Sequence, residues 1–251
     1  VNGELPERAK VIFSNTGREM NETLDFVQEV GHRWNVPIIW VEDADRVKGR
    51  PLFDVVSHKS ASRNGEPFDR LISRKKACPD QQKRFCTEHL KILPARRYII
   101  SLGWEEWSNA IGIRADERHR LKPSTDKRVR KWYPLEDVDK RMVLDFWSRQ
   151  PFDLKVEPGY GNCDGCFMKS EAQLAALCRD HPERAMWWEQ VEEIASSLTS
   201  NEKGARFRKE FTRKQLRETV ERQGSFLFST KEGWCQKNHG ECTLSLFTTN
   251  I

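Results

Sequence analysis

The chain has 251 residues, of which 37% are hydrophobic, 32% are charged and 10% are aromatic, and its formal net charge is +5. This composition excludes an intrinsically disordered chain, and the length suits one α/β domain with a smaller appendage. No apolar run reaches membrane-spanning length and no signal-peptide pattern follows Val1, so we expect a cytoplasmic protein that does not bind membranes. The positive charge favours a polyanionic partner, either a nucleotide or a nucleic acid.

A short apolar run, Val11-Ile12-Phe13, predicts a strand that is buried on both faces. Asn15-Thr16-Gly17 follows it, and apolar positions then recur at helical spacing from Asn21, which we expect to be the N-cap. A second strand is expected over residues 36–41. The order strand, helix, strand predicts an α/β fold with an open, mainly parallel sheet flanked by helices. Because ligands of such sheets bind at the carboxyl ends of strands, the Asn-Thr-Gly turn is either a nucleotide site or an ordinary strand-ending turn.

The middle of the chain predicts three further features. Residues 43–84 are polar and punctuated by glycine and proline, which predicts a long excursion over the active face. A helix is expected from about Thr87 to Trp104, followed by a third strand over residues 109–114 and an arginine-rich turn. An amphipathic helix is expected over residues 136–149. Its predicted core positions are Val138, Met142, Leu144, Phe146 and Trp147.

The character of the sequence changes at Gly159. Three helical patterns, over residues 168–179, 182–198 and 206–223, predict a C-terminal helical lobe that ends in a polar tail. We therefore expect two domains, a nucleotide-binding α/β domain over residues 1–158 and a cysteine-containing lobe over residues 159–251.

Three of the seven cysteines predict a metal site. Cys163 and Cys166 form a Cys-x-x-Cys pair with a glycine between them, which lets both thiolates point at one metal. Cys86 stands immediately before a predicted helix, whose N-terminal dipole is expected to lower its thiol pKa. An iron–sulfur cluster tolerates distant thiolate ligands, whereas structural zinc usually has a second close pair, and unliganded thiols are the third alternative. Cys78 and Cys178 are expected to be ordinary thiols.

Several cations are candidates for anion binding. Arg114 and Arg120 follow a predicted strand end, where guanidinium groups suit phosphate or sulfate oxygens, and the alternative is a solvated surface. Lys91 lies one helical turn beyond Cys86 and faces either the same anion or solvent. The basic run over residues 205–222 is a solvated helix face or a nucleic-acid surface.

In combination, these segments resemble the phosphoadenosine phosphosulfate reductase family of the PP-loop superfamily, which includes phage and DNA-modification relatives. The resemblance covers about residues 10–170. It rests, in chain order, on Asn15-Thr16-Gly17 with Glu22-Thr23, on Cys86-Thr87 with Leu90-Lys91 and Pro94, on Gly112-Ile113-Arg114 with Glu117 and Arg120, on Tyr133-Pro134-Leu135, and on Gly159-Tyr160 with Cys163 and Cys166.

This resemblance implies a PP-loop fold, similar to that of adenine nucleotide alpha hydrolases, and an enzyme of sulfur chemistry that binds ATP, adenylyl sulfate or phosphoadenylyl sulfate. It implies a nucleotide site that is formed by Asn15, Thr16, Gly17, Glu22, Thr23, Lys91, Gly112, Arg114, Glu117 and Arg120. In cluster-containing members a cysteine pair and the Cys-x-x-Cys hold a [4Fe-4S] cluster. The ligands expected here are Cys86, Cys163 and Cys166, with zinc as the alternative metal.

The sequence departs from the family pattern in three places. The Ser-Gly-Gly-x-x-Ser loop that wraps a phosphate or sulfate does not occur in the 251 residues. Either that loop and the first strand precede Val1, which we expect, or this chain is a degenerate member of the family. Phe85 stands where adenylylsulfate reductases with a cluster have a second cysteine. Cys242 is the candidate for the fourth cluster ligand, and Cys178 and Cys235 are weaker candidates. Cys242 also resembles the catalytic cysteine of the family's Glu-Cys-Gly-Leu-His tail, but Ser245 replaces the histidine.

Two classes of function follow. The first is a nucleotide-dependent enzyme that either reduces an activated sulfate, with Cys242 as nucleophile and a thiol electron donor, or adenylates a nucleic acid and transfers sulfur to it from a sulfur donor. The second is a non-catalytic nucleotide or nucleic-acid binding module with structural zinc.

Overall fold

The computed structural model describes residues 8–157, 159–201, 204–223 and 244–248. These residues form a six-stranded sheet with the strand order β3-β2-β1-β6-β4-β5. The strands are β1 (Ala9–Ser14), β2 (Ile38–Asp43), β3 (Phe53–Val56), β4 (Trp107–Ala110), β5 (Val129–Trp132) and β6 (Leu244–Thr248). The predicted α/β class is confirmed.

The sheet is mixed, and the prediction of a mainly parallel sheet is wrong. β1 pairs with β2 in parallel and β4 pairs with β5 in parallel, whereas β6 lies between β1 and β4 and is antiparallel to both. β3 is antiparallel to β2 at the edge. Local patterns predicted the parallel pair of β1 and β2, whereas β5 was not predicted as a strand. The insertion of β6 from the far end of the sequence leaves no local signal.

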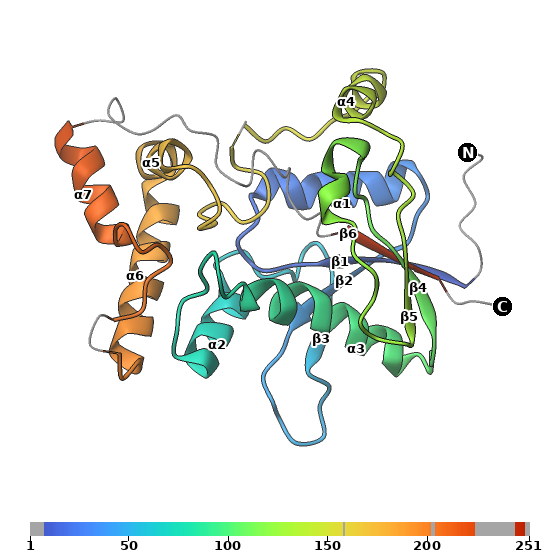
Figure 1. Ribbon diagram of the computed structural model, residues 1–251, viewed down its shortest axis with the longest axis horizontal. Coiled ribbons are helices and arrows are strands. Elements are labelled where there is room, and N and C mark those ends of the chain that lie inside the picture. Colours follow the sequence, from blue (N-terminus) through green and yellow to red (C-terminus); the bar gives the residue numbers. More distant parts are fainter. Residues whose placement is uncertain (1–7, 158, 202–203, 224–243, 249–251) are drawn as a thin grey trace.

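β1 is buried on both faces, as predicted, and alternate residues face different layers. Ile12 packs with Ala95 and Ile99 of α3 (Leu93–Ser101), whereas Phe13 packs with Leu24 and Val27 of α1 (Asn21–Arg33). Because successive side chains of a strand point to opposite faces, one apolar run supports both layers. Figure 1 shows α1 and α3 on opposite sides of the sheet.

α1 begins at Asn21, but the prediction that Asn21 is the N-cap is wrong. Met20 holds the cap position with extended backbone and makes no side-chain cap hydrogen bond. The side chain of Asn21 instead accepts a hydrogen bond from Arg63, at 2.9 Å.

The predicted excursion over residues 43–84 contains regular structure. Besides β3 it forms α2 (Glu66–Lys75), which buries Pro67, Phe68, Leu71 and Ile72. These apolar residues recur at helical spacing, but the charged residues between them led the segment to be predicted as irregular.

The predicted helix over 87–104 is confirmed in outline. It starts as a π-helical segment, η1 (Thr87–Ile92), and continues as α3. Segments of π-helix are uncommon and often lie at functional sites. Beyond it, the predicted third strand ends early, because β4 stops at Ala110 and the chain then turns into the 3-10 helix η2 (Ala115–Arg120).

The amphipathic helix α4 (Lys140–Ser148) forms, but its apolar positions are not core. Met142, Leu144 and Phe146 are 49%, 59% and 46% exposed, and Val138 and Trp147 are partly buried. Trp147 stacks on Trp34 of α1 with 5.5 Å between ring centroids. The spacing predicted the helix correctly but not its burial, which depends on what packs against it.

The C-terminal lobe consists of α5 (Glu171–Asp180), α6 (Pro182–Leu198) and α7 (Arg213–Gln223). The third helix therefore begins later than the predicted residue 206. The largest apolar cluster joins this lobe to α2 and η1, with Phe68 and Leu90 packed in the same core as Trp188 and Phe207. The division at residue 158 stays a prediction. No helix within the described ranges is long and apolar enough to cross a membrane.

Candidate functional site

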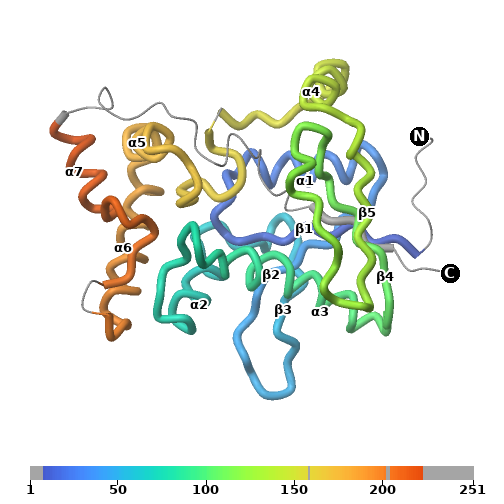
Figure 2. The backbone as a smooth tube through the Cα atoms, in the orientation of Figure 1, coloured from blue at the N-terminus to red at the C-terminus, as the bar shows by residue number. Residues whose placement is uncertain are grey.

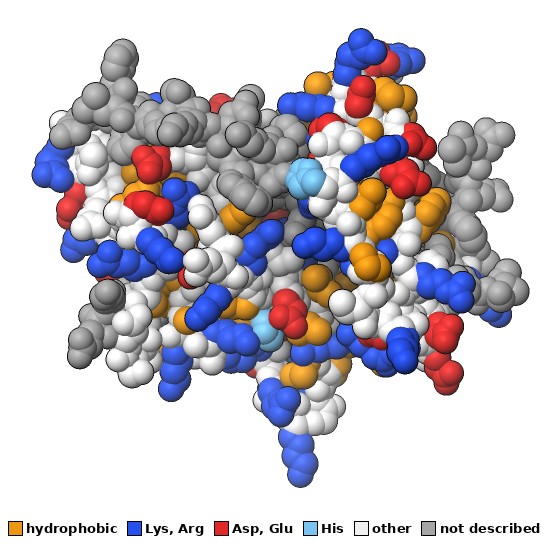
Figure 3. All heavy atoms as spheres, viewed as in Figure 1, with side chains coloured by type: hydrophobic (Ala, Val, Ile, Leu, Met, Phe, Trp, Pro, Cys, Tyr) orange, Lys and Arg blue, Asp and Glu red, His pale blue; other side chains and the backbone are white. Residues whose placement is uncertain are grey.

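A cavity of about 800 Å³ opens where β1 and β4 end. Ser14 and Thr16 reach it from the end of β1, and Asn109 and Ile111 reach it from β4 and the turn after it. This is the sheet edge at which the sequence predicted ligand binding. Two groups of side chains give the cavity its chemistry, namely thiols and cations. Lys and Arg side chains lie on either side of the central hollow of the face shown in Figure 3.

Three thiols line this cavity, those of Cys86, Cys163 and Cys166. They come from segments that are distant in sequence, the residue before η1 and the loop before α5. Thr16 Oγ1 lies 3.3 Å from Cys163 Sγ. The three cysteines thus share a cavity, and their convergence on one metal stays a prediction.

Burial favours the protonated form of two of these thiols, those of Cys86 and Cys163. It raises the pKa of the Cys86 thiol to about 12 and also raises the pKa of Cys163, although the nearby charge of Lys91 lowers both. The expected lowering of the Cys86 pKa by a helix dipole is therefore wrong, because desolvation of the thiolate outweighs the dipole.

The three cysteines of the cavity were predicted to be metal ligands, and the metal stays a prediction. Among the residues that the structure describes, no three His, Cys, Asp or Glu side chains are placed to hold one metal ion. Thiolate ligands suit both zinc and iron–sulfur clusters, so the placement of these cysteines along one cavity does not choose between the two. Cys78 is buried in the apolar core and Cys178 packs against it, as predicted for ordinary thiols. Cys235 and Cys242 lie outside the described residues.

Six cations line the same cavity and offer it positive charge. They are Arg84, Lys91, Arg96, Arg120, Lys122 and Lys131. Arg120 is fixed by Glu117, whose carboxylate is 1% exposed and accepts from Arg120 Nη1 at 2.5 Å while Arg114 Nη1 lies 3.4 Å away. Arg114 also pairs with Asp116 at 2.7 Å. The structure thus brings Arg120 and Lys91 to the cavity wall, whereas Arg114, Glu117 and Gly112 do not line the cavity.

The three residues of the Asn-Thr-Gly turn have different structural roles. Asn15 is fully buried and donates to Glu42 at 2.6 Å and to the Ser62 carbonyl at 2.8 Å. Gly17 has a φ of +77°, and a Cβ there would lie 3.0 Å from Pro67. Only Thr16 of the three lines the cavity. Of the other predicted nucleotide ligands, Glu22 is exposed on α1 and Thr23 is partly buried, and neither lines the cavity. Their nucleotide role stays a prediction.

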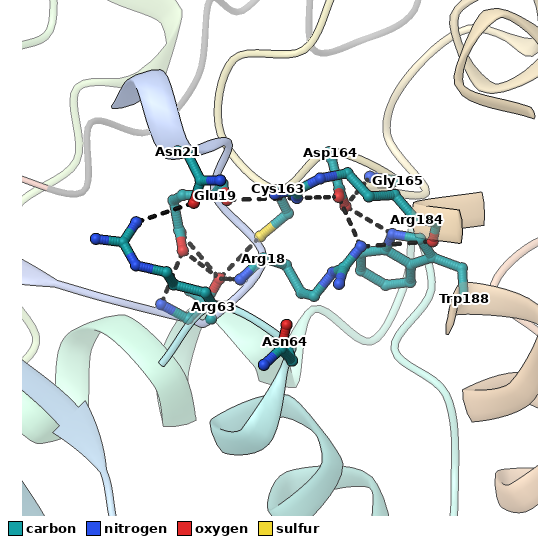
Figure 4. Close-up of polar contacts among 12 residues, drawn as sticks. Arg18, Glu19, Asn21, Arg63, Asn64, Cys163, Asp164, Gly165, Arg184 and Trp188 are labelled. Carbon is teal, nitrogen blue, oxygen red and sulfur yellow. Dashed lines mark hydrogen bonds and ion pairs between the residues drawn. The ribbon is translucent and has the colours of Figure 1, made fainter. Parts of the chain in front are cut away.

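The residue after this turn carries an ion-pair network that the sequence analysis missed. Asp164 accepts from Arg18 Nη2 and from Arg184 Nη1, both at 2.6 Å, and from Trp188 Nε1 at 2.7 Å. Figure 4 shows these residues meeting beside Cys163. An aspartate between two cysteines was the available signal, because a carboxylate inside a tight thiol loop adds negative charge that needs a cationic partner.

Further cations hold the thiol loop by its carbonyl groups. Lys169, which is 2% exposed, donates to the carbonyls of Gly159 and Gly161, and Arg213 donates to the Gly165 carbonyl at 2.6 Å. Arg213 belongs to the basic run over residues 205–222, and Arg217 of the same run pairs with Glu189 at 2.7 Å. Part of that run therefore serves internal packing.

Asp69 gives the network a testable pH dependence. Burial raises its pKa from 3.8 to about 6, although its hydrogen bond with Trp187 and the charge of Arg18 lower it. The folded protein therefore holds this proton more tightly than the unfolded chain, and we expect the contribution of Asp69 to stability to be lost as the pH rises from about 4 to about 6. In urea unfolding, the free energy of unfolding should fall less across this pH range for Asp69→Asn than for the wild type or for the exposed-site control Asp153→Asn. An unchanged pH slope would contradict the assignment.

Comparison with known proteins finds two relatives. The chain is 32% identical over 175 residues to an uncharacterised nin-region protein of Escherichia phage lambda, across 67% of this chain and 59% of that protein. It is 22% identical over 195 residues to an uncharacterised protein of Methanocaldococcus jannaschii, across 73% of this chain and 35% of that protein. The chain thus spans only part of the length of each. No family model and no solved structure matches it.

Proposed function

We propose that the cavity at the ends of β1 and β4 binds an adenine nucleotide and serves sulfur chemistry with an iron–sulfur centre, as in enzymes similar to phosphoadenosine phosphosulfate reductase. The observation that carries this proposal is the joint placement of three thiols with Lys91 and Arg120 on the wall of one cavity. A cavity of about 800 Å³ has the size range of small-molecule sites.

The cations supply recognition of the anionic end of the ligand. Arg120 presents a planar guanidinium that suits two oxygens of a phosphate or sulfate, and Glu117 fixes that group from behind. Lys91 adds a positive point charge near Cys86 and Cys163, and this charge lowers the pKa of both thiols. Negative charge that develops on a sulfonyl or phosphoryl group would be stabilised by both cations.

The thiols are the donors for the metal centre. Cys86, Cys163 and Cys166 would hold a [4Fe-4S] cluster, which supplies electron transfer when bound. Thr16 contacts Cys163 and so links that ligand to the strand end where the nucleotide is proposed to bind. The role of Cys242 as nucleophile or fourth ligand falls outside the described residues.

The reaction class has two versions, which differ in the acceptor of the chemistry. Reduction of an activated sulfate needs a thiol electron donor, whereas sulfur transfer after adenylation needs a sulfur donor and a nucleic acid. A non-catalytic binding module with structural zinc is the alternative function.

Replacing Arg120 by alanine tests the nucleotide site. We expect calorimetric titration with ATP to show an affinity about tenfold to a hundredfold weaker than that of the wild type, since a hydrogen bond to a charged group contributes about 1.5–3 kcal/mol. Arg118→Ala is the matched control, because Arg118 is 59% exposed and pairs with Asp137 at the surface. An equal loss in both variants, or no binding of ATP or phosphoadenylyl sulfate by the wild type, would contradict the proposed site.

A further inference from the structure

The loop that follows β1 and the loop that carries the cysteine pair touch at two neighbouring points. Thr16 contacts Cys163, and Arg18 pairs with Asp164. The chain path in Figure 2 brings these loops together although they are far apart in sequence. We propose that Asp164 is a positioning residue, which sets the place of the Cys163 thiol on the cavity wall by fastening the cysteine loop to the loop after β1. This inference does not depend on which ligand the cavity binds.

Both oxygens of the Asp164 carboxylate accept hydrogen bonds. One oxygen, Oδ2, accepts from the two guanidinium groups of Arg18 and Arg184, and the other, Oδ1, accepts from Trp188 Nε1 and from the Gly165 N–H, both at 2.7 Å. The side chain has no exposed surface. Because a buried charge is stable only when it is paired and hydrogen-bonded, these partners fix the carboxylate in place.

The fastening also involves the main chain. The Asp164 N–H donates to the Arg18 carbonyl at 3.0 Å, so the two loops are joined both through side chains and through backbone. Arg18 is itself held, because its guanidinium lies 4.3 Å from the ring centroid of Trp187. α6 therefore supports the contact through Arg184, Trp187 and Trp188.

Thr16, whose hydroxyl contacts the Cys163 thiol, is itself held in place by Glu19. Thr16 Oγ1 lies 2.8 Å and 2.9 Å from the two oxygens of Glu19, and the Thr16 N–H donates to the same carboxylate at 3.0 Å. The hydroxyl that touches Cys163 is thus itself immobilised. Asp164 directly follows Cys163, as Figure 4 shows, so we expect a shift of Asp164 away from Arg18 to move the Cys163 thiol away from the Thr16 hydroxyl.

The test measures where the cysteines become accessible. Wild type and Asp164→Asn are treated with chelator and reductant so that all thiols are metal-free, then pulsed with iodoacetamide, and each cysteine is quantified by mass spectrometry. We expect the alkylation rate of Cys163 to rise at least about tenfold in Asp164→Asn, because an uncompensated pair of buried cations opens the local structure. The rate at Cys78, which is buried in the core, should stay within about twofold.

A second pair of variants keeps the test decisive if Asp164→Asn does not fold. Arg18→Gln removes the charge opposite Asp164, whereas Arg18→Lys retains it, so Cys163 should be alkylated faster in the first variant than in the second. Asp153→Asn, at an exposed position, should leave all rates unchanged. Equal increases at Cys163 and Cys78 would show general loosening and overturn the proposal. An unchanged rate at Cys163 in folded Asp164→Asn, or equal rates in the two Arg18 variants, would overturn it as well.

Discussion

Replacing Trp188 by alanine is expected to lower the free energy of unfolding by about 4 kcal/mol, within the range for truncating a buried tryptophan. Trp188 is 1% exposed and lies at the centre of the largest core, with its ring centroid 5.2 Å from that of Phe68 and 5.1 Å from that of Phe207. Its Nε1 group also donates to Asp164, so the substitution removes both packing volume and a hydrogen bond to a buried carboxylate.

Urea unfolding followed by circular dichroism measures this change. Trp132→Ala is the matched control, because Trp132 is 53% exposed on the edge strand β5 and should cost less than about 1 kcal/mol. A similar decrease in the free energy of unfolding in the two variants would mean that the shared core of α2, η1 and α6 is less important for stability than its packing indicates.

Replacing Cys163 by alanine is expected to remove iron and acid-labile sulfide almost completely from protein that is purified without oxygen. The reason is that a cluster depends on its thiolate ligands, and Cys163 supplies one of the three thiols on the cavity wall. The absorption spectrum and analyses for iron, sulfide and zinc provide the measurement. Cys86→Ala and Cys166→Ala should behave in the same way.

Cys178→Ala is the control for this loss, because Cys178 packs against the core and does not line the cavity. Its iron and sulfide should equal those of the wild type. Zinc alone in the wild type, lost in Cys163→Ala, would replace the cluster with a structural metal and favour the binding module. Wild-type protein with neither metal would contradict the metal site itself.

Patterns local to a segment predicted many elements of this fold correctly. The apolar run at residues 11–13 became β1, the periodicity from Asn21 became α1, and most boundaries of α5 and α6 were close. The same patterns failed for α4, where the spacing was amphipathic but the apolar side chains are exposed. Spacing reports which face of an element is apolar, whereas burial depends on a partner that the spacing does not contain.

For the candidate site, the amino-acid sequence is sufficient to identify the chemical groups that are present: a cysteine pair, a third cysteine before a helix, and cations after a strand end. Which of these groups share a cavity depends on how the chain folds: Thr16, Lys91 and Arg120 line it, whereas Asn15 is buried and Glu22 lies outside. It also decided that Asp164 meets Arg18 and that burial, not the helix dipole, governs the pKa of Cys86. Contacts between residues so distant in sequence, and the desolvation that they cause, depend on how the chain packs, and no local pattern encodes them.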